Sequence, residues 1–69
     1  MKEEKYLKEM GVKLKAARKK HKLSLPKLSK LCGIHLTSLW FIENGKSNVH
    51  LLTLKKIADV YKMDVKDFL

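Results

Sequence analysis

Gly33 lies between two short segments with helical periodicity, residues 25–32 and 36–43, and this spacing limits the folds that the chain can adopt. Ser24 is a good N-cap for the first segment, and Pro26 falls in its first turn, where a backbone N–H has no helical partner. Gly33 then ends the helix, as a C-terminal glycine does. Two short helices joined by a tight turn containing glycine form a helix-turn-helix, whose second helix keeps its outer face free for a DNA groove.

The second of these helices ends at Asn44-Gly45, and apolar residues at spacings of three and four predict helices on both sides of it. One is expected over residues 4–21 and another over residues 51–62. The stretch DVKDFL, residues 64–69, predicts a short last helix. No segment alternates between apolar and polar residues as a strand does. We therefore expect an all-α, compact fold of five short helices.

Gly11 interrupts the first helix and is a candidate for its real start. Residues 1–10 are then an N-terminal extension or the start of this helix, and residues 11–69 form a single helix-turn-helix domain. Asp64 is expected to cap the last helix, with Asp67 as the capping-box acid. The apolar stripe of the first helix consists of Leu7, Met10, Leu14, Ala17 and His21. In the other helices, the side chains expected to point into the core are Leu28, Leu31, Cys32, Leu39, Ile42, Leu51, Leu54, Ile57, Ala58, Tyr61, Phe68 and Leu69.

The chain is strongly basic, with 16 Lys and Arg against 7 Asp and Glu, a net charge of +9 and a pI near 9.9. A small basic domain suits a polyanion, and nucleic acid is the first candidate. The single cysteine excludes an intramolecular disulfide and fits a reducing cytoplasm. No apolar run is long enough for a membrane span, and the N-terminus lacks the apolar core of a secretory signal. We expect a cytoplasmic protein, associated with the nucleoid if the source is bacterial.

No set of residues predicts catalysis. Cys32-x-x-His35 and the distant His50 lack the second close pair of ligands that a structural zinc site needs. The chain has no glycine-rich phosphate loop and no nucleophile with a base and an orienting group. We therefore expect no enzyme, no metal and no cofactor.

From about Gly11 to Leu69, the sequence resembles the lambda-repressor-like, or Xre-type, DNA-binding proteins. The resemblance is carried by Arg18, by LSLPKLSKLCGI (residues 23–34), by LWFIENGKSN (residues 39–48) and by LLTLKKIADVYKMDVKDFL (residues 51–69). It implies a sequence-specific transcriptional regulator, repressor-like, whose third helix contacts the bases of double-stranded DNA.

The resemblance also implies roles for single residues. Arg18 and Glu43 match a pair that ties the first helix to the end of the third, and an arginine fork suits a partly buried carboxylate. Ser24, with the start of the second helix, matches a phosphate contact. His35 and His50 stand where the family caps two helices with Ser or Thr, and histidine is a weaker cap. The further contacts near phosphates are Lys27, Asn44, Lys46, Ser47 and Asn48.

The positions of Leu36, Thr37 and Phe41 are the usual base readers of this family. Here the sequence departs from the family, because leucine and phenylalanine cannot match hydrogen-bond donors and acceptors. Leu25 stands where the family has glutamine, which braces the complex or contacts DNA. The four-residue spacing places Leu36, Thr37, Trp40 and Phe41 on one continuous outer face, with Leu25 nearby.

Three interpretations of this apolar face remain open. In the first, Leu36 and Phe41 meet thymine methyl groups, and Thr37 and Ser38 bond bases or phosphates. In the second, the fold serves as a protein-interaction module, antitoxin-like or anti-repressor, and the face docks on a protein partner. In the third, Trp40 folds back over the loop before the fourth helix and belongs to the core.

One domain contacts only half of a two-fold symmetric DNA site, so a homodimer is expected. With Leu69 as the last residue there is no room for a separate dimerisation domain, so the dimer is expected to be weak or to form only on DNA. On family grounds, the fourth helix and the VKDFL end are the candidate interfaces.

Overall fold

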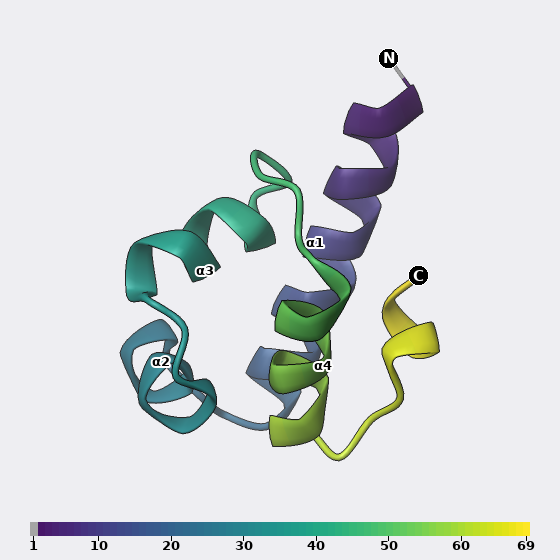
Figure 1. Cartoon of the computed structure of the whole chain (residues 1–69). Helices are drawn as coiled ribbons and strands as arrows, with labels where there is room; N and C mark the ends of the chain where they lie inside the picture. The colour runs from purple at the N-terminus through teal and green to yellow at the C-terminus, as the bar shows by residue number, and fades with distance from the viewer. Residues whose placement is uncertain (1) are drawn as a thin grey trace.

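The computed structural model describes residues 2–69, so Met1, the first residue of the expected extension, lies outside the described residues. The helices are α1 (Lys2–Lys20), α2 (Leu25–Cys32), α3 (Leu36–Glu43), α4 (Leu51–Val60) and a 3₁₀ helix, η1 (Val65–Phe68) (Figure 1). The described residues contain no strand. The expected all-α fold with five helical segments is confirmed, and α2 and α3 have the expected bounds. The last segment is a 3₁₀ helix, shorter by one residue at each end than expected.

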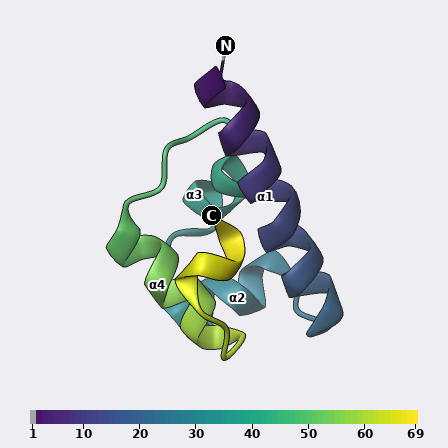
Figure 2. The same ribbon diagram turned by 90° about the vertical axis from the view of Figure 1, so that its right-hand side faces the viewer.

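Each helix supplies at least one side chain to a single core. The largest fully buried side chains are Leu14, Leu28, Leu39, Leu54, Ile57 and Phe68. α3 packs against α1 and α2, α2 also packs against α4, and η1 packs against α1 and α4. Figure 2 shows η1 lying across the side of the molecule between α1 and α4, whereas Figure 1 shows α3 on the opposite side. This arrangement holds α3 from behind and leaves its outer face uncovered.

Four side chains expected in the core lie at the surface instead. Leu31 is 54% exposed because it lies about 60° around α2 from the buried Leu28. Leu51 is 67% exposed, in the first turn of α4, where the core has ended. Leu69 follows η1 and is 69% exposed. His21 is also exposed, just beyond the end of α1. Periodicity defined each stripe but not how far the neighbouring helices cover it.

Gly11 does not mark the start of the first helix, because α1 runs without a break from Lys2 to Lys20. A Cβ atom on Gly11 would lie 2.4 Å from the carbonyl oxygen of Glu43 and 2.8 Å from that of Ile42. The glycine therefore lets the end of α3 lie directly on the backbone of α1. Residues 2–10 are the first turns of this helix. Met10 packs against the core and the backbone of Lys8 lies against Gly45, whereas Figure 1 shows the N-terminal end of α1 extending beyond the other helices.

The caps explain most of the helix ends. Ser24 accepts a hydrogen bond from the N–H of Lys27 at 3.2 Å, and Gly33 takes a left-handed conformation with φ of 74°. The expected capping box of Asp64 and Asp67 is present at η1. His35 caps α3, since its Nδ1 accepts the N–H of Thr37 at 3.2 Å, whereas the side chain of His50 makes no such bond at α4.

α4 ends at Val60, two residues earlier than expected, because Lys62 adopts a left-handed conformation with φ of 56°. The N–H of Lys62 donates to the carbonyl of Asp59, and that of Met63 donates to the carbonyl of Ala58, which together form a Schellman motif. Glycine takes this conformation without the steric cost that a Cβ atom brings.

Lys62→Gly is therefore expected to raise the free energy of unfolding by about 0.5–1 kcal/mol, after part of the relieved strain is offset by the greater freedom of the unfolded chain. The expected rise in melting temperature is a few degrees, measured by circular dichroism. Lys62→Ala is the matched control, because it removes the same charge but keeps the Cβ atom. Equal melting temperatures for the two variants would contradict the argument.

Candidate nucleic-acid interface

α3 has a buried inner face and an apolar outer face. Leu39 and Ile42 point into the core and are 1% and 6% exposed. Leu36, Trp40 and Phe41 are 40%, 44% and 41% exposed on the other side of the helix. The interpretation of Trp40 as a core residue is therefore wrong. An exposed apolar face of this kind is a candidate contact surface.

The outer face of α3 meets the first turn of α2 at an open hollow of about 480 Å³. We call it the apolar hollow; its lining residues are Leu25, Pro26, Leu36, Thr37, Trp40 and Phe41. The rings of Trp40 and Phe41 meet edge to face, with centroids 5.2 Å apart and planes at 89°. This edge-to-face geometry is a favoured one for aromatic pairs.

The N-terminus of α2 borders the apolar hollow. Pro26 has no N–H and that of Lys27 donates to Ser24, which leaves the N–H of Leu25 at this helix end. The helix dipole places partial positive charge here, and both features attract phosphate. Ser24 lies at this end as the cap, and Lys27 is exposed one turn further on. The structure thus brings together the phosphate candidates of α2 and the apolar candidates of α3.

The other end of α3 is fixed by backbone hydrogen bonds. Gly45 has φ of 68°, its N–H donates to the carbonyl of Ile42, and the N–H of Lys46 donates to the carbonyl of Phe41. The side-chain amide of Asn44 donates to the carbonyl of Trp40 at 2.8 Å. The candidates that follow, Lys46, Ser47 and Asn48, lie in the loop to α4, where the hydroxyl of Ser47 donates to the carbonyl of Asn48 at 3.1 Å. Ser38 is exposed in the middle of α3.

Arg18 and Glu43 form a bidentate ion pair that joins α1 to the end of α3. The Nε of Arg18 donates to Oε2 at 2.8 Å, and its Nη2 donates to Oε1 at 3.0 Å. The Glu43 side chain is only 4% exposed. Nη1 of Arg18 donates to the carbonyl of Leu23 at 2.8 Å, just before the Ser24 cap. One guanidinium therefore sets the end of α3 relative to the start of α2.

The ion pair and burial together shift the pKa values of Arg18 and Tyr61. The hydrogen bond to Glu43 raises the pKa of Arg18 above its ordinary value, against the opposing effect of burial. Burial, followed by the charge of Glu43, raises the pKa of Tyr61 well above its ordinary value. The buried hydroxyl oxygen of Tyr61 has no hydrogen-bond partner among the described residues. Arg18 therefore stays charged and Tyr61 stays neutral.

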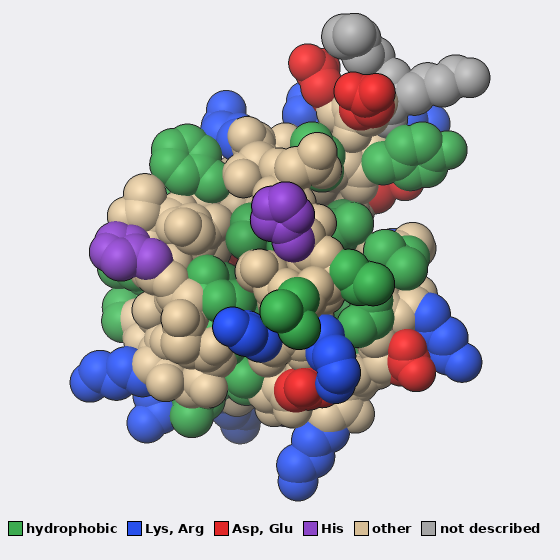
Figure 3. Space-filling model, in the orientation of Figure 1, with side chains coloured by type: hydrophobic (Ala, Val, Ile, Leu, Met, Phe, Trp, Pro, Cys, Tyr) green, Lys and Arg blue, Asp and Glu red, His purple; other side chains and the backbone are tan. Residues whose placement is uncertain are grey.

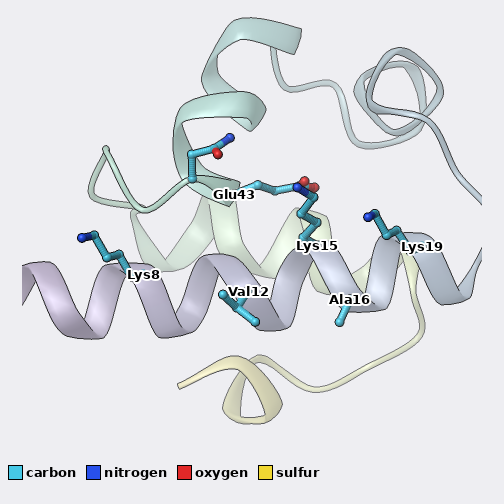
Figure 4. Close-up of a pocket in the computed structure, with 7 residues that line it drawn as sticks. Lys8, Val12, Lys15, Ala16, Lys19 and Glu43 are labelled. Atoms are coloured by element: carbon cyan, nitrogen blue, oxygen red, sulfur yellow. The ribbon is translucent and has the colours of Figure 1, made fainter.

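Three lysines that the sequence analysis did not single out lie beside the end of α3. Lys8, Lys15 and Lys19 line a hollow on α1 together with Val12, Ala16, Glu43 and Asn44. Figure 4 shows the three lysine side chains extending from α1 on the side where α3 ends. Their spacings of seven and four place them on one face of the helix, but other lysines of α1 occupy its other faces, so the spacing alone does not distinguish these three. Figure 3 shows hydrophobic side chains on the face of the molecule that it presents, with most Lys and Arg side chains toward the edge.

The described part of the chain holds no group of three or more His, Cys, Asp or Glu side chains that could bind a metal ion. Cys32 is a free cysteine and is partly buried. None of the helices in residues 2–69 combines the length and the apolar character that a membrane crossing requires.

Comparison with solved structures gives close matches to this fold. An HTH_3 family transcriptional regulator from Vibrio cholerae is 30% identical with a TM-score of 0.89, and the match covers 96% of this chain but only 37% of that protein. The restriction-modification controller protein C.AhdI from Aeromonas hydrophila is 25% identical with a TM-score of 0.87, over 91% of this chain and 96% of its own. The DNA-binding domain of BldD is 28% identical with a TM-score of 0.82, over 94% of each chain.

A search of curated protein sequences finds no match. The family model for HTH_3, helix-turn-helix, matches residues 14–68, which include all of α2, α3 and α4 and most of the core. Because this match spans well over half of the chain and agrees with the fold, the protein belongs to the HTH_3 helix-turn-helix family.

Proposed function

We propose that this chain is a sequence-specific, DNA-binding transcriptional regulator of the repressor-like kind, with α3 entering the major groove. The observation that carries the proposal is the free outer face of α3, held from behind by the core and bordered by the N-terminus of α2. The net charge of +9 supplies the attraction to a polyanion. Membership of the HTH_3 family supports the same function.

Binding would proceed through two kinds of contact. Phosphate contacts position the protein and provide most of its salt-dependent affinity, and base contacts provide specificity. The proposed phosphate contacts are Ser24, Lys27, Asn44, Lys46, Ser47 and Asn48. The proposed contacts inside the groove are Leu25, Leu36, Thr37, Ser38, Trp40 and Phe41. Arg18 and Glu43 would hold these two sets in register without contacting DNA.

The protein would bind as a homodimer, with one α3 in each of two half-sites about 34–36 Å apart. Leu51 and Leu52 expose apolar side chains at the start of α4, where a second copy could cover them. Two protein chains are the expected stoichiometry on a duplex that carries both half-sites.

The proposal is tested by fluorescence anisotropy with a short labelled duplex of random sequence at a series of salt concentrations. The logarithm of the affinity should fall linearly with the logarithm of the salt concentration, and Lys46→Ala should make this slope shallower by about 0.9. Lys13→Ala removes the same charge on the η1 side of α1, where Lys13 Nζ donates to the carbonyl of Leu69 at 3.2 Å. This control should leave the slope unchanged. Equal slopes for both variants would remove Lys46 from the interface.

A protein partner is the second candidate, and the exposed apolar hollow is the observation that favours it. Such a partner would cover Leu36, Trp40 and Phe41 in the way that hot-spot residues are covered in protein interfaces. The same titration separates the two functions. Failure to bind DNA at low salt, despite the net charge of +9, would reject the regulator and favour the protein partner.

A further inference from the structure

The proposed groove-contacting surface lacks the side chains that normally distinguish bases. Discrimination by hydrogen bonds depends on bidentate pairs, formed by arginine or lysine with guanine and by asparagine or glutamine with adenine. None of these residue types lines the apolar hollow. Its exposed side chains are apolar except for the hydroxyl of Thr37 and the single indole N–H of Trp40. A hydroxyl both donates and accepts, so it accommodates several bases.

Three polar side chains around the hollow each use one atom to hold a helix end. The amide nitrogen of Asn44 donates to the carbonyl of Trp40, and Nδ1 of His35 accepts the N–H of Thr37. The hydroxyl of Ser24 accepts the N–H of Lys27. Using these atoms to contact a base would cost intramolecular bonds that hold the ends of α2 and α3. The remaining donors and acceptors of these three side chains belong to residues that do not line the hollow, so within the hollow only Thr37 and Trp40 offer a hydrogen-bonding group.

The major groove offers one apolar group, the methyl group at C5 of thymine. Methylated cytosine carries the same group at the same ring position. The apolar hollow is far larger than one methyl group, and it includes Leu25 and Pro26 at the N-terminus of α2, directly before the exposed Lys27. These features fit a duplex edge with several adjacent C5-methyl groups better than they fit a pattern of donors and acceptors.

Resting on the proposed function, we propose that the apolar hollow selects DNA by the C5-methyl groups of its pyrimidines, so that thymine is bound in preference to uracil. Removing one methyl group from an apolar contact should weaken binding about fourfold, as expected for a buried methylene-sized group. Exchange of a contacted thymine·adenine pair for 5-methylcytosine·guanine should weaken binding less than exchange for cytosine·guanine.

The experiment begins with selection of the tightest duplex from random DNA, which is then synthesised once with thymine and once with uracil. Anisotropy at a single salt concentration gives both affinities. The duplex containing uracil should bind about fourfold more weakly for each contacted methyl group. Leu36→Ala should reduce the thymine-to-uracil ratio toward one. Leu31→Ala, an exposed leucine of α2 outside the hollow, is the matched control and should keep the ratio.

The outcomes separate the two proposals. Salt-dependent binding of the thymine and uracil duplexes with equal affinity would overturn methyl recognition and leave the DNA-binding function standing. A ratio that persists unchanged in Leu36→Ala would also overturn it, because the methyl groups would then be contacted elsewhere. Absence of binding to any duplex would reject the function and the inference together. Circular dichroism confirms that both variants are folded before either ratio is interpreted.

Discussion

Gly11→Ala is expected to destabilise the protein by about 3 kcal/mol or more, the upper range for overpacking. The added Cβ atom would lie 2.4 Å from the carbonyl oxygen of Glu43, and the next contacts, at 2.8 and 2.9 Å, are also backbone atoms of α3. Backbone cannot rotate aside as a side chain can, so α1 and α3 would have to separate. Helix propensity alone predicts that Gly11→Ala stabilises the protein, because alanine is favoured over glycine in a helix by about 1 kcal/mol.

Chemical denaturation followed by circular dichroism measures this change. Gly33→Ala is the matched control, since Gly33 has φ of 74° but nothing lies within 4 Å of an added Cβ atom. It should cost only the conformational strain, about 1–2 kcal/mol. A Gly11→Ala protein as stable as the parent would show that α1 and α3 do not approach as closely as described.

Arg18→Met is expected to lower the free energy of unfolding by about 3–5 kcal/mol, the usual cost of removing one partner of a buried ion pair. The carboxylate of Glu43 would remain, 4% exposed and without its two hydrogen bonds. The carbonyl of Leu23 would also lose its donor. Because these groups join α1 to α2 and α3, weaker DNA binding should accompany the loss of stability.

The double variant Arg18→Met/Glu43→Leu keeps this prediction testable if the single variant does not fold. Removing both charges leaves no unpaired carboxylate, so the double variant should recover most of the lost stability. The measurement is the denaturation midpoint of the parent, of both single variants and of the double variant. A Glu43→Leu variant that melts within one degree of the parent would argue against the ion pair as a stabilising contact.

The ends of α2 and α3 could be predicted from the sequence because they depend on local chemistry. Ser24, Gly33 and the Asn44-Gly45 pair act on their own backbone, whatever the rest of the chain does. Gly11 was misjudged for the opposite reason. Its role depends on the backbone of Glu43, which lies 32 positions away in the sequence, and a local pattern contains no information on that approach.

For a similar reason, the sequence predicted the exposed apolar residues of α3 but not the lysines of α1 beside them. The four-residue spacing of Leu36 and Trp40 placed both on the outer face of α3, and both are exposed there. Lys8, Lys15 and Lys19 could not be selected, because lysines occur around much of α1 and only the position of α3 distinguishes these three. How the side chains of this surface meet a ligand stays a prediction.

The most direct test of DNA entry by α3 is a titration of the isotope-labelled protein with duplex DNA, followed by the backbone amide resonances and the indole resonance of Trp40. The account predicts that the largest shifts fall in residues 24–27 and 36–48 and on the indole, while η1 stays unchanged. Shifts confined to α4 and η1, with no response from Trp40, would contradict it.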